Sequence, residues 1–399
     1  MLWWWLACTG PQSEPEPEPA EAPAQTEDTA YPDDIEWQAE DHPLDPIEKT
    51  GESTSCSSVN PMKDHEEGLR LVEGFDLPWL SGVTKDPDVL TKRAANLEAL
   101  KTRLKDSGDE ERWLLFIHGT GLQTWPGFQG LSGDPQLYAH LRDTYDGRLM
   151  AMEHLGTNGL VCHNIRAFAE NLAEASGGDK HLDVDIVAMS KGGLIARALM
   201  FQDGGASICG EDYLAKHGLS LQVERAVLLV GPHEGTPSAR NNQYLYARKA
   251  KCITSMKVAE DAIPKGPVPD EAPKACTGDP KAGRGGLEQG GDAKLTTRCS
   301  KRLFRAFDSA GSPPVTEVYT VAMEWSDPWP ESLSNYGNPF PGAHDLIVPT
   351  SQAASIGGEP QPVETLKLKG SHVDVTAHVQ VHAALRRWLT KPLSPPPEP

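Results

Sequence analysis

The sequence predicts an α/β protein with a mostly parallel central sheet and helices packed on its faces. From about residue 59 onward, apolar runs bounded by turn residues alternate with stretches of helical periodicity. Three of the apolar runs end directly in glycine-containing turns, after residues 117, 189 and 230. Such turns are typical of the carboxyl edge of a parallel sheet, where functional residues gather.

Six apolar runs are expected to be strands: residues 113–118, 148–153, 183–189, 225–230, 317–323 and 363–369. Four stretches between and after them are expected to be helices: residues 136–145, 164–175, 194–202 and 379–389. The last helix has its apolar residues on one stripe, which is suited to packing on a sheet.

The 399 residues are expected to divide into a short leader (1–8), a spacer (9–55), a globular domain (56–391) and a disordered tail (392–399). The spacer is rich in Pro, Glu and Ala, and such a composition buries too little apolar surface to fold. Inside the domain, residues 239–300 are rich in Gly, Pro and Lys and contain three cysteines. This insertion is interpreted either as a lid over an active site or as a surface insertion held by disulfides.

The net charge of −20 is unevenly distributed. Residues 11–52 contain fourteen acidic residues and one lysine, so most of the negative charge belongs to the spacer. An acidic chain without clustered Lys and Arg excludes nucleic acid as an expected partner, because phosphate backbones require basic patches.

The N-terminus resembles the lipobox of bacterial lipoproteins, in which a cysteine after Leu-Ala is lipidated. Here Leu6-Ala7-Cys8 precedes the polar spacer, although Trp5 departs from the usual leucine. No basic region precedes the apolar run, so we expect the true start codon to lie upstream. The resemblance implies an extracytoplasmic protein anchored by lipid at Cys8 to a bacterial cell envelope, and the alternative is a cytosolic protein with an apolar N-terminus.

Six further cysteines favour export, because an even number outside the cytosol predicts up to three disulfides. They are Cys56, Cys162, Cys209, Cys252, Cys276 and Cys299, and their pairing is left open. None is spaced as a zinc ligand, so no metal site is expected.

Ser190 is the candidate nucleophile. It follows the apolar run Ile186–Met189 and begins the turn Ser-Lys-Gly-Gly, after which the pattern becomes helical. A sharp turn from strand to helix exposes a serine hydroxyl at the edge of a sheet, and small residues allow the helix to begin close to the strand. The alternative is a serine that only caps the helix.

A second motif, His118-Gly119-Thr120-Gly121, ends the strand expected at 113–118 and lies at the same sheet edge. The backbone N–H of Lys191, together with that of Thr120 or Gly121, is expected to form an oxyanion hole. His118 itself is expected to be structural.

The order of these motifs resembles the α/β-hydrolase superfamily, and within it the bacterial lipase-like branch. That branch has a His-Gly-Thr segment, a Gly-His-Ser-x-Gly-Gly turn and a Gly-Thr-Pro segment, which residues 235–237 match after the next strand. Ala188 and Met189 replace the usual Gly and His before Ser190. The resemblance covers residues 110–390 and implies the α/β-hydrolase fold.

The resemblance also implies an acid and then a histidine after the nucleophile in the chain. Asp345, in the segment Asp-Leu-Ile-Val-Pro, matches the acid turn of the family, and Asp327 is the competing position. His372 follows the last expected strand and is the expected base, with His378 and His382 as alternatives.

The resulting expectation is a serine hydrolase that cleaves small-molecule or lipid carboxylic esters through an acyl-enzyme, without metal or organic cofactor. Trp125, Pro126 and Phe128 are expected either to line an apolar acyl site or to belong to the core. The rival function is a catalytically silent α/β-hydrolase-fold module that binds ligands at the cell envelope. Neither the acyl chain length nor the oligomeric state follows from the sequence.

Overall fold

The computed structural model describes residues 67–77, 86–119, 124–154, 161–234, 303, 306–315, 317–327, 342–356 and 360–393. All of them belong to one unit of the chain, residues 52–399. The expected leader, spacer and insertion (1–8, 9–55 and 239–300) lie outside the described residues.

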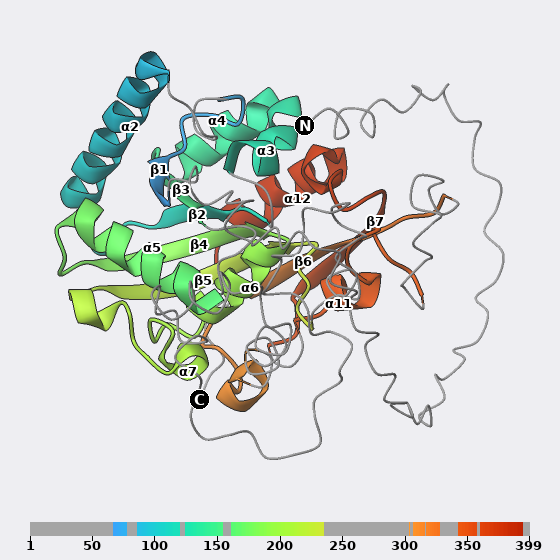
Figure 1. The fold of residues 1–399 in the computed structure, drawn as a ribbon. Helices are drawn as coiled ribbons and strands as arrows, with labels where there is room; N and C mark the ends of the chain where they lie inside the picture. The colour runs from blue at the N-terminus through green and yellow to red at the C-terminus, as the bar shows by residue number, and fades with distance from the viewer. Residues whose placement is uncertain are drawn as a thin grey trace, which may run out of the picture. The chain divides into compact units, whose positions relative to one another are not determined.

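The described part of the chain contains one sheet of seven strands in the order β1-β3-β2-β4-β5-β6-β7 (Figure 1). Strand β1 is antiparallel to β3, and every other neighbouring pair is parallel. This topology, with helices on both faces, is the α/β-hydrolase fold. The strands are β1 Gly68–Leu71, β2 Trp113–Ile117, β3 Leu149–Glu153, β4 His181–Met189, β5 Ser220–Leu229, β6 Glu317–Glu324 and β7 Glu364–Lys369.

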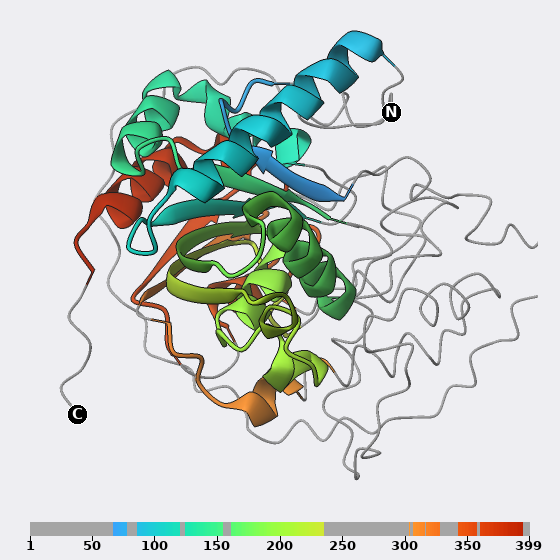
Figure 2. The same ribbon diagram turned by 90° about the vertical axis from the view of Figure 1, so that its left-hand side faces the viewer.

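Helices cover the two faces of the sheet in two groups. The first group, α2 Pro87–Asp106, α5 Val161–Ser176 and α6 Lys191–Leu199, shares a core with one set of strand side chains. The second, α4 Pro135–Thr144 and α12 Val379–Thr390, packs on the other set, and these two helices lie together (Figures 1 and 2). Short helices complete the described fold: α3 Thr124–Phe128, η3 Gln129–Gly133, α7 Ala206–Cys209, η4 Ala215–His217, α11 Thr350–Ala354 and η8 Val375–Ala377.

The two faces of the sheet follow from the period of two along a strand. In β4, Ile186 and Ala188 face the core under α5 and α6, whereas Val187 and Met189 face the core under α4 and α12. All four side chains are buried. A continuous apolar run is therefore what this central strand requires, since it is covered on both sides.

The six expected strands and four expected helices are present, with small shifts at their ends. Strands β4 and β5 begin earlier than expected, at His181 and Ser220. The edge strand β1, the 20-residue helix α2 and the short helices were not predicted.

Helix α2 has clear start signals. The Asp86 side chain accepts a hydrogen bond from the Asp88 N–H, and Pro87 occupies the first turn. Only a narrow stripe of α2 is buried, and this stripe is partly polar. Asn96 on that stripe donates to the backbone oxygen of Leu71 at 2.9 Å and accepts from its N–H at 3.0 Å, which satisfies backbone groups at the end of the edge strand β1.

Three neighbouring strands carry a row of fully buried ionic side chains. The Nε of Arg225 on β5 donates to Glu317 on β6 at 3.0 Å, and its Nη1 lies 3.6 Å from Asp185 on β4. Asp185 also accepts from the Tyr145 hydroxyl at 2.6 Å, at the end of α4. The row fixes the register of β4, β5 and β6, because an unpaired buried charge is strongly destabilising.

Cys162 on α5 and Cys209 on α7 form a disulfide. This pairing was one of those left open by the sequence, and the other cysteines lie outside the described residues. Among the helices that the structure describes, none combines the length and the apolar character that a membrane crossing requires.

Candidate active site

Ser190 lies between the end of β4 and the start of α6 with strained backbone dihedrals, φ 54° and ψ −126°. A side chain in this region costs on the order of 1–3 kcal/mol, and such strain is concentrated at functional sites. Ser190 occupies the N-cap position of α6, but its side chain makes no capping hydrogen bond. Helix capping therefore does not explain why a serine occupies this position.

Two glycines allow other backbone segments to approach Ser190. A Cβ on Gly192 would lie 2.3 Å from the carbonyl oxygen of Ile117, so helix α6 begins in contact with the end of β2. A Cβ on Gly119 would lie 2.8 Å from the Cβ of Ser190. The His-Gly segment after β2 and the serine turn after β4 are thus brought together, as the sequence predicted.

Asp345 and His372 form a buried pair. The Nδ1 atom of His372 donates to Oδ2 of Asp345 at 2.8 Å, and the backbone N–H of His372 donates to the Asp345 carbonyl at 2.8 Å. The other carboxylate oxygen, Oδ1, accepts from the N–H groups of Ile347 at 2.9 Å and Val348 at 2.7 Å. With Nδ1 bearing the proton, Nε2 is the basic nitrogen of a neutral His372.

The alternative candidates for the acid and the base make other contacts. Asp327 is exposed after β6, and none of its described contacts is with His372. His378 caps helix α12 by accepting from the Gln380 N–H at 3.3 Å. His382 bonds through Nε2 to the carbonyl of Thr376 at 2.8 Å. These contacts give both alternative histidines structural roles in α12 and the segment before it.

Ser190 and His372 both follow strands that run in the same direction, so they lie at the same edge of the sheet. Within the described residues no hydrogen bond joins the two side chains. Hydrogen bonds between nucleophile and base are often long without substrate and shorten in the complex.

Of the expected oxyanion donors, Lys191 is described, whereas Thr120 and Gly121 lie outside the described residues. Lys191 is the first residue of α6, and the N–H groups of a first helical turn have no acceptor within the helix. Its side chain is fully buried, and burial lowers the pKa of the ammonium group to about 7. Glu67 opposes this shift.

Bacterial lipases are among the solved structures similar to this chain. The mature form of the Bacillus licheniformis lipase BlEst2 is 14% identical, with 72% of this chain and 95% of that chain covered and a TM-score of 0.37. EstA from Clostridium botulinum is 11% identical over 72% and 90%, with a TM-score of 0.41. Lipase 1 from Pelosinus fermentans is 12% identical over 71% and 100%, also with a TM-score of 0.41.

A family model described as "Domain of unknown function (DUF7379)" matches residues 84–272, which include Ser190 but neither Asp345 nor His372. No sequence among curated proteins matches the chain. The assignment of roles to individual residues therefore rests on the geometry of this chain.

Sequence reasoning did not identify Asp374 and Glu153. Asp374 accepts from both the N–H and the hydroxyl of Ser371, at 2.9 and 2.6 Å, and so shapes the turn that carries His372. Glu153 is buried at the end of β3 and accepts from the Thr124 N–H at 3.1 Å. A carboxylate three residues after a serine signals a turn, but nothing in the sequence connects Glu153 with Thr124.

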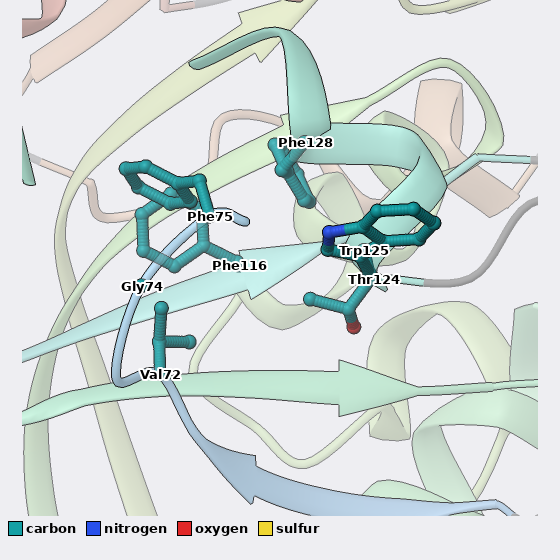
Figure 3. A pocket seen from close by; sticks show the side chains of 7 residues that line it. All are labelled: Val72, Gly74, Phe75, Phe116, Thr124, Trp125 and Phe128. Atoms are coloured by element: carbon teal, nitrogen blue, oxygen red, sulfur yellow. The ribbon is translucent and has the colours of Figure 1, made fainter. Parts of the chain in front are cut away.

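A small apolar pocket, open to solvent on one side, lies beside β2 (Figure 3). It is lined by Val72, Gly74, Phe75, Phe116, Thr124, Trp125 and Phe128. Phe116 packs edge-to-face against both Phe75 and Phe128, with ring centres 5.4 and 5.1 Å apart. Phe128 is buried in the core that supports α3, while Trp125 is half-buried, and the side chain of Pro126 lies outside the described residues.

No group of three or more His, Cys, Asp or Glu side chains in the described part of the chain is arranged to hold a metal ion.

Proposed function

We propose that this protein is a serine hydrolase that cleaves carboxylic esters of small molecules or lipids. The observation that carries the proposal is the strained Ser190 at the same sheet edge as the buried Asp345–His372 pair. Serine, histidine and aspartate have separate roles in this chemistry, as the nucleophile, the base and the acid that orients the base.

In the proposed reaction, Nε2 of His372 removes the proton of Ser190 Oγ while that oxygen attacks the ester carbonyl carbon. Asp345 keeps the proton on Nδ1 and stabilises the imidazolium that forms. The backbone N–H of Lys191, together with one from residue 120 or 121, stabilises the developing oxyanion. His372 then protonates the departing alcohol, and water, activated by the same histidine, releases the acid from the acyl-enzyme.

The full chain, with its disulfide oxidised, is expected to react with a fluorophosphonate ester. This reagent phosphonylates serines that are activated by a neighbouring base. Intact-mass analysis should show one adduct, and peptide mapping should place it on Ser190. An absence of adduct on the folded, oxidised protein would contradict the proposal and favour the catalytically silent binding module.

We also propose that the protein is extracytoplasmic and anchored by lipid at Cys8. The Cys162–Cys209 disulfide supports the compartment, because such bonds persist outside the reducing cytosol. In bacterial cells that process lipoproteins, the wild-type protein should enter the detergent phase on partitioning, and Cys8→Ser should move it to the aqueous phase. Equal partitioning of both forms would contradict the anchor.

A further inference from the structure

Glu153 is the last residue of β3 and lies beside the end of β2. Its carboxyl group binds the backbone of Thr124, six residues after His118. Its two oxygens lie 3.1 and 3.4 Å from the N–H of Thr124, the first residue of α3. The side chain is 5% exposed, so this contact is made almost without water. The carboxyl group therefore fixes where the backbone resumes at α3.

The same carboxyl group faces His118. Oε2 of Glu153 lies 3.5 Å from Nε2 of His118, which is itself fully buried. That nitrogen accepts the backbone N–H of His154 at 3.2 Å, so it carries a lone pair and no proton. The ring proton is then on Nδ1, which donates to the carbonyl of Gly119 at 2.9 Å.

His154 supports this tautomer from the other side. Its ring stacks on that of His118 with centres 3.9 Å apart, and its Nε2 donates to the His118 carbonyl at 2.8 Å. Its Nδ1 lies 3.4 Å from the amide nitrogen of Asn164. These contacts are consistent with one tautomer for each ring, with the proton on Nδ1 of His118 and on Nε2 of His154.

The lone pair on His118 Nε2 limits the charge that Glu153 can carry. An ionised carboxylate at 3.5 Å would place negative charge against this lone pair in a site without water. A doubly protonated His118 would relieve that contact, but its new N–H would oppose the N–H of His154. A proton on Glu153 removes both conflicts.

Burial favours a protonated carboxyl at Glu153, and the charged groups around it do not reverse this effect. Burial raises the pKa of Glu153 to about 7. The hydrogen bond from Thr124 and the guanidinium groups of Arg70 on β1 and Arg93 on α2 act in the opposite direction and do not cancel it. Within the described part of the chain, the His118 ring also faces this carboxyl group.

The contact matters because Gly119 adjoins the candidate nucleophile. No side chain fits on Gly119, because a Cβ there would collide with Ser190. The Gly119 carbonyl held by His118 also belongs to the same planar peptide unit as the next N–H, one of the expected oxyanion donors. A shift of His118 would therefore turn that peptide relative to Ser190.

We propose that Glu153 is a positioning residue that acts in its protonated form, anchoring Thr124 and allowing His118 to keep the Gly119 peptide in place beside Ser190. When Glu153 loses this proton, the resulting carboxylate repels the lone pair of His118 and disturbs the Gly119 peptide. The inference rests on the proposed hydrolase function, and it adds an alkaline limit on turnover that a serine, histidine and aspartate alone do not impose.

The test is the pH profile of kcat for p-nitrophenyl acetate hydrolysis by the full chain and by Glu153→Gln. The glutamine keeps an oxygen for Thr124 and offers an N–H₂ donor to His118, so it imitates the protonated carboxyl at every pH. Wild-type kcat should fall about tenfold per pH unit above pH 7. The Glu153→Gln variant should retain its rate at pH 9, with kcat at pH 6 within about threefold of wild type.

Two further variants separate positioning from folding. Glu153→Leu should lower kcat at pH 6 to at least about tenfold below that of wild type with little change in KM, because the oxyanion contact is made in the transition state. Asp185→Asn removes another buried acid, whose pKa burial raises to about 6, far along β4 from the serine turn. It should leave the alkaline limit in place.

An alkaline limit that persists unchanged in Glu153→Gln would overturn the inference while leaving the hydrolase proposal intact. A wild type that neither hydrolyses esters nor reacts with fluorophosphonate would instead contradict the hydrolase proposal. The proton itself is measured without activity, because infrared difference spectra of wild type minus Glu153→Gln should show a protonated carboxyl band at pH 6 that disappears by pH 9. Absence of that band would also overturn the inference.

Discussion

Ser190→Ala is expected to lower kcat/KM for a p-nitrophenyl ester by about 10⁶-fold, because the attacking oxygen is removed. Residual hydrolysis would come from ester binding and oxyanion stabilisation alone. The fold should survive, since Ala retains the Cβ that packs against Gly119 and the serine makes no capping bond. Steady-state kinetics and thermal unfolding of both forms measure the two effects.

The strained backbone of Ser190 provides a second check on this prediction. Ser190→Gly should be equally inactive but at least as stable as wild type, because glycine adopts φ 54° without a Cβ penalty. Ser207→Ala is the matched control, since Ser207 is an exposed serine on the short helix α7. More than a tenth of wild-type activity in Ser190→Ala would exclude Ser190 as the nucleophile.

The central strands could be predicted because they are covered on both faces. Their sequences are continuous runs of apolar residues, as in Trp113–Ile117, and such runs have few alternatives in an α/β chain. Strand β1 has only four residues and includes an arginine and a glycine, so its sequence carries little period-two signal. Its position depends on pairing with β3, which is distant in the chain.

Helix α2 escaped prediction for a related reason. Only four of its 20 residues are buried, and two of these are polar, Arg93 and Asn96. The apolar stripe that marks an amphipathic helix is therefore nearly absent. The Asp86-Pro87 start signal was available, but start signals alone do not specify how far a helix extends.

Within the candidate site, the Asp345–His372 pair could be anticipated, because Asp345 belongs to a short motif that resembles the acid turn of a known family and His372 follows the last strand. Glu153 could not, because its proposed role rests on burial and on contacts with His118 and Thr124, which are 29 or more residues away in the chain. Neither separation nor burial is visible in the local sequence around Glu153. Buried polar residues at strand ends are thus where the structure adds most to the sequence.

Asp345→Asn is expected to lower kcat/KM by about 10⁴-fold while leaving the fold intact. An asparagine oxygen can still accept from the Ile347 and Val348 N–H groups that hold the present carboxylate. Its N–H₂ group would then face His372 and donate to Nδ1, which forces the ring proton onto Nε2. A histidine with that tautomer cannot remove the proton of Ser190.

Asp327→Asn is the matched control, because Asp327 is the other acid that the sequence offered and is exposed after β6. It should leave kcat/KM within about twofold of wild type, since exposed substitutions rarely disturb a buried site. The two variants are compared by ester hydrolysis and by the rate of fluorophosphonate labelling at pH 6 and at pH 9. A large loss in Asp327→Asn with little change in Asp345→Asn would transfer the role of the acid to Asp327. Equal losses of kcat/KM in both variants would indicate that both acids after β6, rather than Asp345 alone, maintain His372 in its position.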